Sequence, residues 1–357
     1  MNAHHKPLHV LELEGTSRAR GYQHGRALRE PIERAVDFYR FFFGKHLGLE
    51  WTAVRERVGP FLEATVALSP KLAAEYEGIA DGARQRLEDV VALSARYEIT
   101  YSALALGDCS NVYVGPNRSA DGHTLLGQSW EWRPEVMDFR AVLVARCDDV
   151  PDHIVVTECG QPGKYGLNAL GVGVVAAGLY ARDKTSIGDQ LCVGLAREIL
   201  AQSSFAAACR VIEQHPPRAT VNMMVAAAGG GAADFEATGS RLWRRDLERS
   251  EVYWHTNHCR QVTEPCAFEN SLIRGKRWSA LLESTEPVTC ERLQGWLADR
   301  SDASDARLYD AVGYTPLVYI SAAMTALAWV LVPLVKIDRI EARARAEAAA
   351  LPESTTS

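Results

Sequence analysis

The stretch Leu106-Gly107-Asp108-Cys109-Ser110-Asn111 marks the point where the sequence changes from helical to strand-like patterning. Before Cys109, apolar residues recur at helical spacing; after it come short β-type runs separated by Asn, Asp, Gly and Pro. If the bond between Asp108 and Cys109 were cut, the cysteine would carry a free α-amine beside its thiol. This junction therefore predicts where the sheet begins and which side chain is the first candidate for chemistry.

The residues before the junction predict a mainly helical N-terminal segment, 1–108. A short strand is expected over 8–14, followed by a helical run from Arg18 to about Leu47. Three more helical segments are expected over 51–66, 70–86 and 87–105. This segment is also the α fragment that cleavage before Cys109 would release.

The residues after the junction predict a β-rich core that spans 109–337. Expected strands are centred on 112–114, 125–126, 141–144, 154–156, 171–178, 220–228, 235–237 and 252–256. Expected helices cover 189–215, with a break at 202–204, and also 271–284 and 290–299. A surface helix and a disordered tail would complete the chain over 338–357. Because no internal repeat or low-complexity linker interrupts the sequence, we expect the two halves to share one core.

Composition narrows the class of protein. With 357 residues, 47% of them hydrophobic and 24% charged, the chain can bury a substantial core. A net charge of −6 and a pI near 6.0 argue against a general nucleic-acid binder and favour a small-molecule partner. The eight cysteines lack CxxC spacing and are expected to be mostly buried and reduced. Since the N-terminus has no apolar signal region, we expect a cytoplasmic protein.

The apolar stretch 317–335 carries no charge and approaches the length that spans a bilayer. Ser321, Thr325 and Pro333 interrupt it, and its two ends, 317–320 and 329–332, each have the composition of a β-strand. We therefore expect two buried strands and no membrane contact. A transmembrane helix is the alternative, because periodicity alone does not separate a buried strand from a buried helix.

Five short motifs accompany the cysteine in order along the chain. They are Gly15–Gly25 (GTSRARGYQHG), Glu75–Ala83 (EYEGIADGA), Gly127–Trp132 (GQSWEW), Gly163–Gly171 (GKYGLNALG) and His255–His258 (HTNH). Together with the order of elements, they resemble the acyl-coenzyme A:isopenicillin N acyltransferase family of N-terminal-nucleophile cysteine hydrolases, the acyl-coenzyme A:6-aminopenicillanic acid acyltransferases. The resemblance covers most of the chain.

The resemblance implies an α+β fold, a four-layer αββα sandwich. It also implies a precursor that cuts itself before Cys109 and leaves two associated fragments. No cofactor is implied, although acyl-coenzyme A is among the family's acyl donors and would be a co-substrate. The expected partners are a small-molecule amide or acyl thioester and the chain's own cleaved fragment, within secondary metabolism.

The chemistry of a cysteine at this position agrees with the resemblance. A thiol can attack the preceding carbonyl in an N-to-S shift, and hydrolysis of the thioester frees the α-amine. With an ordinary pKa of about 8, that amine can act as general base for its own thiol at neutral pH, so no histidine is required. The family usually has glycine where this chain has Asp108, a difference that bears on the cleavage rate more than on the nucleophile. The alternative for Cys109 is a buried core thiol, which its place at the junction disfavours.

Three more side chains are assigned by the same resemblance. Asn257 would donate from its amide to the oxyanion of a tetrahedral intermediate, and the alternative is an asparagine that caps a turn. Glu131 stands where the family has an aspartate after Trp, and would orient the new ammonium unless it is a solvated strand charge. Arg307 aligns loosely with an arginine near the thiolate, but the acidic residues around it fit an exposed loop equally well.

Two further patterns are set aside. His255, His258 and Cys259 are metal-ligand types, yet no distant pair of ligands accompanies them, so no metal site is expected. Gly229–Gly231 lacks the lysine and the Ser/Thr of a P-loop, and a flexible hairpin between strands is the better account.

The sequence thus predicts a self-processing cysteine acyltransferase or amidohydrolase that works through an acyl-enzyme on Cys109. Water or an amine would take the acyl group, and the sequence does not decide between them. The alternatives are a strict N-acyl amide hydrolase and a non-processed, membrane-associated relative without catalysis. We expect the substrate pocket to have walls from the N-terminal helices and from 128–140 and 178–186.

Overall fold

The computed structural model describes residues 8–100, 109–130, 132–181, 189–238, 241–261 and 269–299. The predictions made for Asp108, Glu131, Arg307, the apolar stretch 317–335 and the C-terminal 338–357 lie outside these residues. Among the helices that are described, none has the length and apolar character needed to cross a membrane.

The N-terminal segment forms one strand and a stack of helices. Its elements are β1 (His9–Gly15), α1 (Ser17–Ala27), α2 (Arg29–Leu47), α3 (Trp51–Leu68), α4 (Pro70–Ala83), α5 (Leu87–Ser94) and α6 (Arg96–Thr100). The prediction of one helical run from Arg18 to Leu47 was wrong, because the chain bends at Leu28, whose φ is −109°. Pro31 stands in the first turn of α2, a position typical of proline at a helix start, so the sequence does carry a local signal for this break. The Leu28 side chain is buried in the core, and its packing also holds the bend in place.

Helices α1 and α4 pack closely because glycines face one another between them. A Cβ atom built on Gly25 would lie 2.2 Å from the carbonyl oxygen of Ile79, and one built on Gly82 would lie 2.3 Å from that of Tyr22. Both glycines belong to motifs that the sequence singled out. These motifs therefore specify a close contact between two helices.

This contact predicts a large stability effect at Gly82. In Gly82→Ala the new methyl group meets backbone that cannot move alone, so we expect the free energy of unfolding to fall by about 2–3 kcal/mol. In the matched control, Gly44→Ala in α2, the nearest heavy atom to the new Cβ is 3.9 Å away, and that helix should gain about 0.5–1 kcal/mol. Urea unfolding of both variants measures the difference. Equal stabilities would contradict the close packing of α1 on α4.

The rest of the described chain forms two sheets. The large sheet has the order β1-β4-β5-β6-β7-β8-β9-β10, and the small one has the order β11-β2-β3. The bounds are β2 Cys109–Val114, β3 Leu125–Trp130, β4 Arg140–Cys147, β5 His153–Glu158, β6 Tyr165–Asn168, β7 Val172–Gly178, β8 Val221–Ala227, β9 Ala232–Thr238, β10 Arg241–Asp246 and β11 Val252–His255. Strand β1 pairs with β4 in parallel, whereas the remaining neighbours are antiparallel. Strand β10 was not predicted, because this exposed edge strand lacks the apolar alternation that marks a half-buried strand.

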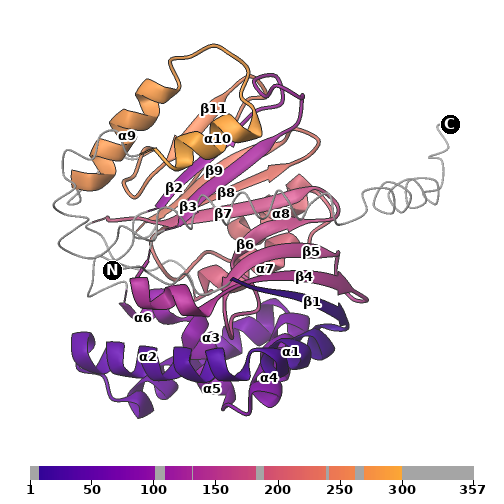
Figure 1. Cartoon of the computed structure of the whole chain (residues 1–357), viewed down its shortest axis with the longest axis vertical. Helices are drawn as coiled ribbons and strands as arrows, with labels where there is room; N and C mark the ends of the chain where they lie inside the picture. Colours follow the sequence, from indigo (N-terminus) through magenta and orange to yellow (C-terminus); the bar gives the residue numbers. More distant parts are fainter. Residues whose placement is uncertain are drawn as a thin grey trace.

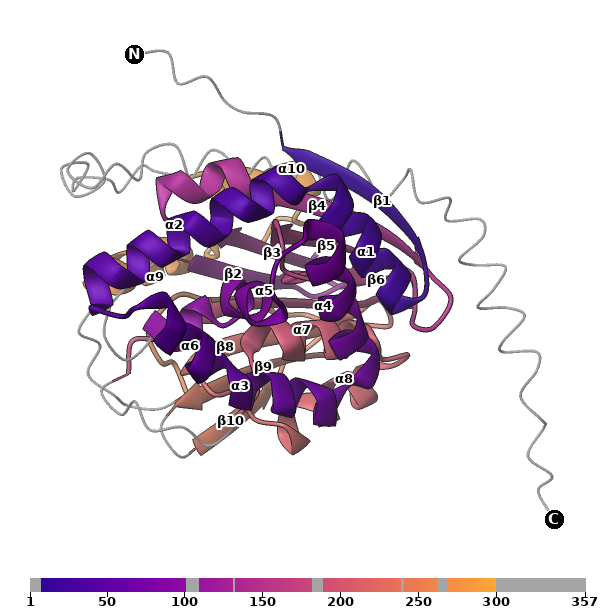
Figure 2. The ribbon, with the colours of Figure 1, turned by 90° about the horizontal axis from the view of Figure 1, so that it is seen from below.

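Helices cover the outer faces of both sheets, as Figure 1 shows. Besides the N-terminal helices, α7 (Cys192–Leu200) and α8 (Phe205–Gln214) pack against the large sheet, and the view from below in Figure 2 shows this helical layer in front of the strands. On the far side, α9 (Glu269–Leu281) and α10 (Cys290–Leu297) cover the small sheet, whereas η1 (Pro134–Phe139) is a short 3-10 helix that leads into β4. The expected α+β fold, a four-layer αββα sandwich, is therefore confirmed.

The alternation of β2 sets the direction of its first residue. Val112 and Val114 pack toward α9 and α10, whereas Tyr113 packs against the large sheet. Since side chains on a strand alternate between faces, Cys109 and Asn111 share the face of Tyr113. The amide of Asn111 accordingly donates to Asn222 of β8. Cys109 therefore faces the space between the two sheets.

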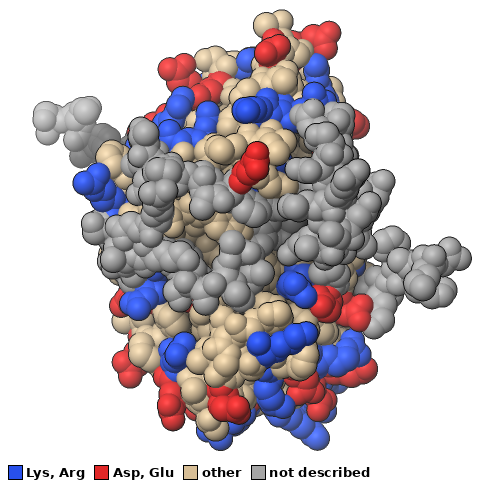
Figure 3. All heavy atoms as spheres, turned by 90° about the vertical axis from the view of Figure 1, so that its left-hand side faces the viewer, with Lys and Arg blue, Asp and Glu red and all other residues tan. Residues whose placement is uncertain are grey.

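The surface carries charges of both signs. On the face shown in Figure 3, basic and acidic side chains are interspersed over the described residues, and no continuous basic patch is seen among them.

Candidate active site

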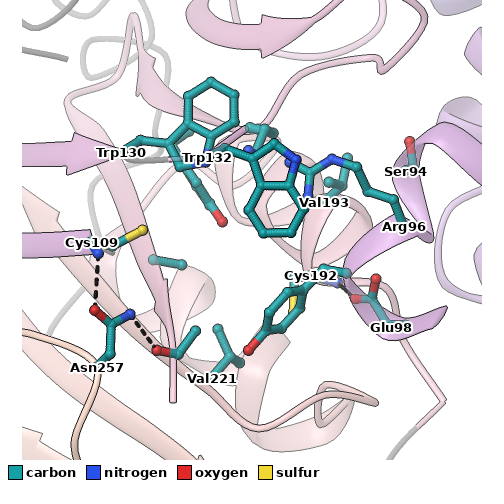
Figure 4. A pocket seen from close by; sticks show the side chains of 15 residues that line it. Ser94, Arg96, Glu98, Cys109, Trp130, Trp132, Cys192, Val193, Val221 and Asn257 are labelled. Atoms are coloured by element: carbon teal, nitrogen blue, oxygen red, sulfur yellow. Dashed lines mark hydrogen bonds between the residues drawn. The ribbon is translucent and has the colours of Figure 1, made fainter. Parts of the chain in front are cut away.

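Cys109 is the first residue of β2 and lines a pocket. It lies opposite Trp130 of β3 in the strand register, and its side chain is only 7% exposed. Figure 4 shows its sulfur directed into the cavity, with its backbone nitrogen turned toward Asn257. Both the thiol and the backbone nitrogen of this residue are thus held at one place.

Asn257 follows the end of β11 and is fixed on several sides. Its backbone N–H donates to Ser271 Oγ at 2.8 Å, and its side-chain Nδ2 donates to the carbonyl oxygen of Gly178 at 2.7 Å. Its Oδ1 accepts the backbone N–H of Cys109 at 2.9 Å. The structure therefore brings together two residues 148 positions apart that the sequence singled out.

Arg274 of α9 joins this pair and was missed by the sequence analysis. Its Nη1 donates to the carbonyl oxygen of Cys109 at 2.6 Å and to Ser110 Oγ at 3.0 Å. Its Nη2 donates to Asn257 Oδ1 at 2.6 Å. Nothing in the single sequence separates this arginine from the other basic residues of its helix. Glu131 and Arg307, which the resemblance also assigned, lie outside the described residues.

The pocket beside Cys109 encloses about 560 Å³, including space open to solvent. The predicted walls contribute α5 and α6, Trp130, Trp132 and Gly178. The sequence did not predict six further lining residues, which are Lys164, Tyr165, Ala176, Cys192, Val193 and Val221. The cavity thus combines aromatic and apolar walls with a few charged groups.

The charged groups form a buried network around Glu158. Its Oε1 accepts Arg96 Nε at 2.9 Å and also Arg96 Nη2, and its Oε2 accepts the Tyr39 hydroxyl at 2.7 Å. Lys164 Nζ lies 3.5 Å from the same Oε1. Burial alone would raise the pKa of Glu158, but Arg96 and Lys164 lower it overall, so the carboxylate stays charged.

Lys164 reaches the pocket from the turn before β6. That turn depends on Gly163, whose φ of 146° is open to glycine and strained for other residues. Burial, assisted by the charge of Arg96, lowers the pKa of Lys164 to about 7, and Glu158 only partly offsets this effect.

Comparison with known proteins shows the family of this chain. The profile described as "Acyl-coenzyme A:6-aminopenicillanic acid acyl-transferase" matches residues 118–329. The chain belongs to this acyltransferase family. It is also 27% identical over 265 residues to the acyl-coenzyme A:6-aminopenicillanic-acid-acyltransferase 40 kDa form of Emericella nidulans, an alignment that covers 73% of this chain and 72% of that protein.

Two solved structures also match parts of the chain at low identity. The Caenorhabditis elegans ortholog of N-acylethanolamine-hydrolyzing acid amidase is 9% identical, with a TM-score of 0.44. The match covers 55% of this chain and 88% of the chain from Caenorhabditis elegans. Penicillin V acylase from Agrobacterium tumefaciens is 15% identical, with a TM-score of 0.33, and covers 60% of this chain and 72% of its own.

A second thiol lines the pocket of this acyltransferase family member. Cys192 begins α7, and its backbone N–H donates to Glu98 Oε1 at 2.8 Å. Burial is the main reason why the pKa of the Cys192 thiol lies well above its ordinary value, and the nearby Glu98 carboxyl raises it further. Because the thiolate is the nucleophile, a thiol held in its protonated form is poorly suited to attack.

Three buried polar side chains form a cluster that includes His255, two residues before Asn257. Asp234, Glu236 and His255 bring their potential ligand atoms within 4.8 Å of one another, a spacing that could hold a metal ion. These atoms already have partners, however. His255 Nε2 lies 2.7 Å from Glu236 Oε1, which also accepts the backbone N–H of Arg260, and Asp234 accepts from Asn222, Tyr253 and Gln261. The cluster therefore reads as an internal hydrogen-bond network that anchors the end of β11.

Proposed function

We propose that this chain is a self-processing cysteine acyltransferase or amidohydrolase that forms an acyl-enzyme on Cys109. The observation that carries the proposal is the placement of both reactive atoms of Cys109. Its thiol lines the pocket, and its backbone nitrogen, which would become the α-amine, is held by Asn257 Oδ1. Membership of the acyltransferase family supports the same chemistry.

Self-cleavage would create the α-amine. The Cys109 sulfur attacks the carbonyl carbon of Asp108, the peptide nitrogen takes a proton as its bond to that carbon breaks, and water then hydrolyses the thioester. The products are a new carboxylate at Asp108 and a free amine and thiol at Cys109. The fragments would stay together, because β1 of the first pairs along its whole length with β4 of the second.

The mature residue would then transfer an acyl group. The α-amine takes the thiol proton, the thiolate attacks the substrate carbonyl, and the leaving group departs with that proton. Gly178 uses one of the two amide hydrogens of Asn257, so the other can stabilise the oxyanion. Water or an amine next attacks the thioester and regenerates the thiol.

Arg274 would act as a positioning residue. By donating to Asn257 Oδ1 and to the Cys109 carbonyl oxygen, it fixes the amide so that Oδ1 faces the amine and Nδ2 faces the pocket side. Its fixed charge also opposes any reversal of the amide, because a flipped Asn257 would present donors to a guanidinium.

We expect Arg274→Met to lower kcat by roughly 10- to 100-fold with a smaller change in KM, because it disturbs transition-state geometry more than binding. Arg277→Met, one turn further along α9, is the matched control, since Arg277 pairs with Asp299 instead. Steady-state kinetics of both variants tests this. A kcat for Arg274→Met equal to that of the control would exclude the positioning role.

Transfer and hydrolysis are separated by following the acyl group. A radiolabelled acyl donor, either an acyl thioester or an N-acyl amide, is offered to the enzyme with water alone and with an added amine. We expect a labelled amide when the amine is present and a labelled acid when it is absent. If no acceptor yields an amide while the acid still forms, the protein is a hydrolase and the transferase part of the proposal fails.

A further inference from the structure

Lys164 places an ammonium group in the pocket, and Glu158 is its ion-pair partner among the described residues. The side chain is 6% exposed, and Nζ lies 3.5 Å from the ring centroid of Trp130 and 5.6 Å from that of Tyr165. The acceptor it contacts is Glu158 Oε1 at 3.5 Å, the long limit of a hydrogen bond. An ammonium has three N–H donors, so a buried one in this setting has capacity for a further acceptor.

Glu158 cannot supply the missing charge because it is committed elsewhere. Arg96 donates twice to its Oε1 and Tyr39 donates to its Oε2. One carboxylate therefore serves two buried cations. Glu98, the carboxyl among the described lining residues of the pocket, accepts the backbone N–H of Cys192 through Oε1 and forms no ion pair with Lys164 among the described residues.

The lowered pKa of Lys164 reflects the same shortage of negative charge. Burial and Arg96 destabilise its ammonium more than Glu158 stabilises it. An anionic ligand would reverse this balance, because it would neutralise the excess charge inside a site of low dielectric. The described titratable and charged groups around this space are Glu98, Arg96 and Tyr97 of α6, Cys109 of β2, Glu158 of β5, Tyr165 of β6 and Cys192 of α7.

We propose that Lys164 binds a carboxylate of the substrate, so that the enzyme acts on amides or thioesters carrying a carboxylate near the bond that Cys109 attacks. The inference rests on the proposed function, which makes this pocket the substrate site. A carboxylate fits the geometry because Lys164 and Cys109 line one cavity and because, among the described residues, the three N–H donors of Lys164 share one acceptor at 3.5 Å. Aromatic faces around the ammonium would exclude the water that competes with such a contact.

Alkylation of Cys109 tests the proposal without requiring turnover. Iodoacetate and iodoacetamide attack thiols by the same chemistry and differ in one negative charge. Peptide mass spectrometry follows the alkylation rate of Cys109 with each reagent. The rate with iodoacetate divided by the rate with iodoacetamide cancels the reactivity of the thiol itself. We expect this ratio to fall about tenfold in Lys164→Gln at pH 6, to persist in Lys164→Arg, and to be unchanged in the exposed control Lys45→Gln.

The pH dependence supplies a second readout. In the wild type the ratio should fall as the pH rises through about 7, because Lys164 then loses its proton and its attraction for iodoacetate. Lys164→Arg should show no fall in this range, since a guanidinium stays charged. A ratio in Lys164→Gln equal to that of the wild type would overturn the proposal, as would an equal loss of both rates, which would mean that Lys164 only stabilises the thiolate.

Failure of the proposed function would look different. A protein that never hydrolyses or transfers an acyl group can still show a Lys164-dependent ratio, because alkylation needs only an accessible thiol. Conversely, if the enzyme is active and the rate ratio is the same in Lys164→Gln as in the wild type, only the carboxylate site is refuted.

Discussion

Cys109→Ala is expected to lower the acyl-transfer and hydrolysis rates by about 10⁴-fold or more, because no other group can form the acyl-enzyme. Among the cysteines that the structure describes, Cys192 shares the pocket, but its raised pKa keeps its thiol protonated. The substitution removes only one sulfur atom, so the protein should remain folded, which thermal unfolding can check. Cys109→Ser should also be nearly inactive, since a hydroxyl is a much weaker acid than a thiol.

The matched control for this loss is Cys209→Ala. Cys209 is a buried thiol of α8 that belongs to the main apolar core and does not line the pocket. We expect this variant to lose some stability and to keep its activity. Activity in Cys109→Ala within tenfold of the wild type would remove the nucleophile from the account, whatever the control shows.

Asn257→Asp is expected to lower kcat by about 10²–10³-fold, the range found when one oxyanion donor is removed from other hydrolases. The aspartate keeps the size of the side chain, and its oxygens can still accept from the Cys109 nitrogen and from Arg274. It loses the donors that serve Gly178 and the oxyanion. A fall in kcat with little change in KM would locate the effect in the transition state.

The control for Asn257→Asp is Asn117→Asp, which makes the same amide-to-acid change at an exposed position. Its kinetics should match those of the wild type. If Asn257→Asp were within about threefold of the wild type, the oxyanion would have to be held by other donors, and Asn257 would be left with the turn-capping role that the sequence also allowed.

Much of the fold could be predicted from sequence because local patterns encode it. The change of period at Cys109 located the start of β2, and the glycine motifs before it correspond to the close contact of α1 with α4. The bend at Leu28 was missed because the apolar spacing continues across it, although Pro31 in the first turn of α2 is a local signal for a helix start. Strand β10 was not predicted from the sequence, because an exposed edge strand lacks the apolar face that produces an alternating pattern.

Beyond Cys109, the candidate site could be predicted only where resemblance supplied a residue. Asn257 was found in this way, whereas Cys109 was already indicated by its place at the change of pattern; the two residues lie in contact. Arg274 was missed because its role depends on a helix that returns to the nucleophile 165 residues later in the chain. Lys164 stood in a quoted motif without a role, since only the folded structure shows that this lysine is buried in the pocket.

Intact mass of the purified protein tests the central claim most directly. The account predicts two chains for the wild type, residues 1–108 and residues 109–357, and a single uncut chain for Cys109→Ala. Co-elution of the two wild-type fragments on size exclusion would show that they stay associated. A wild type that remains one uncut chain, with no free amine at Cys109, would contradict the self-processing N-terminal nucleophile on which the account depends.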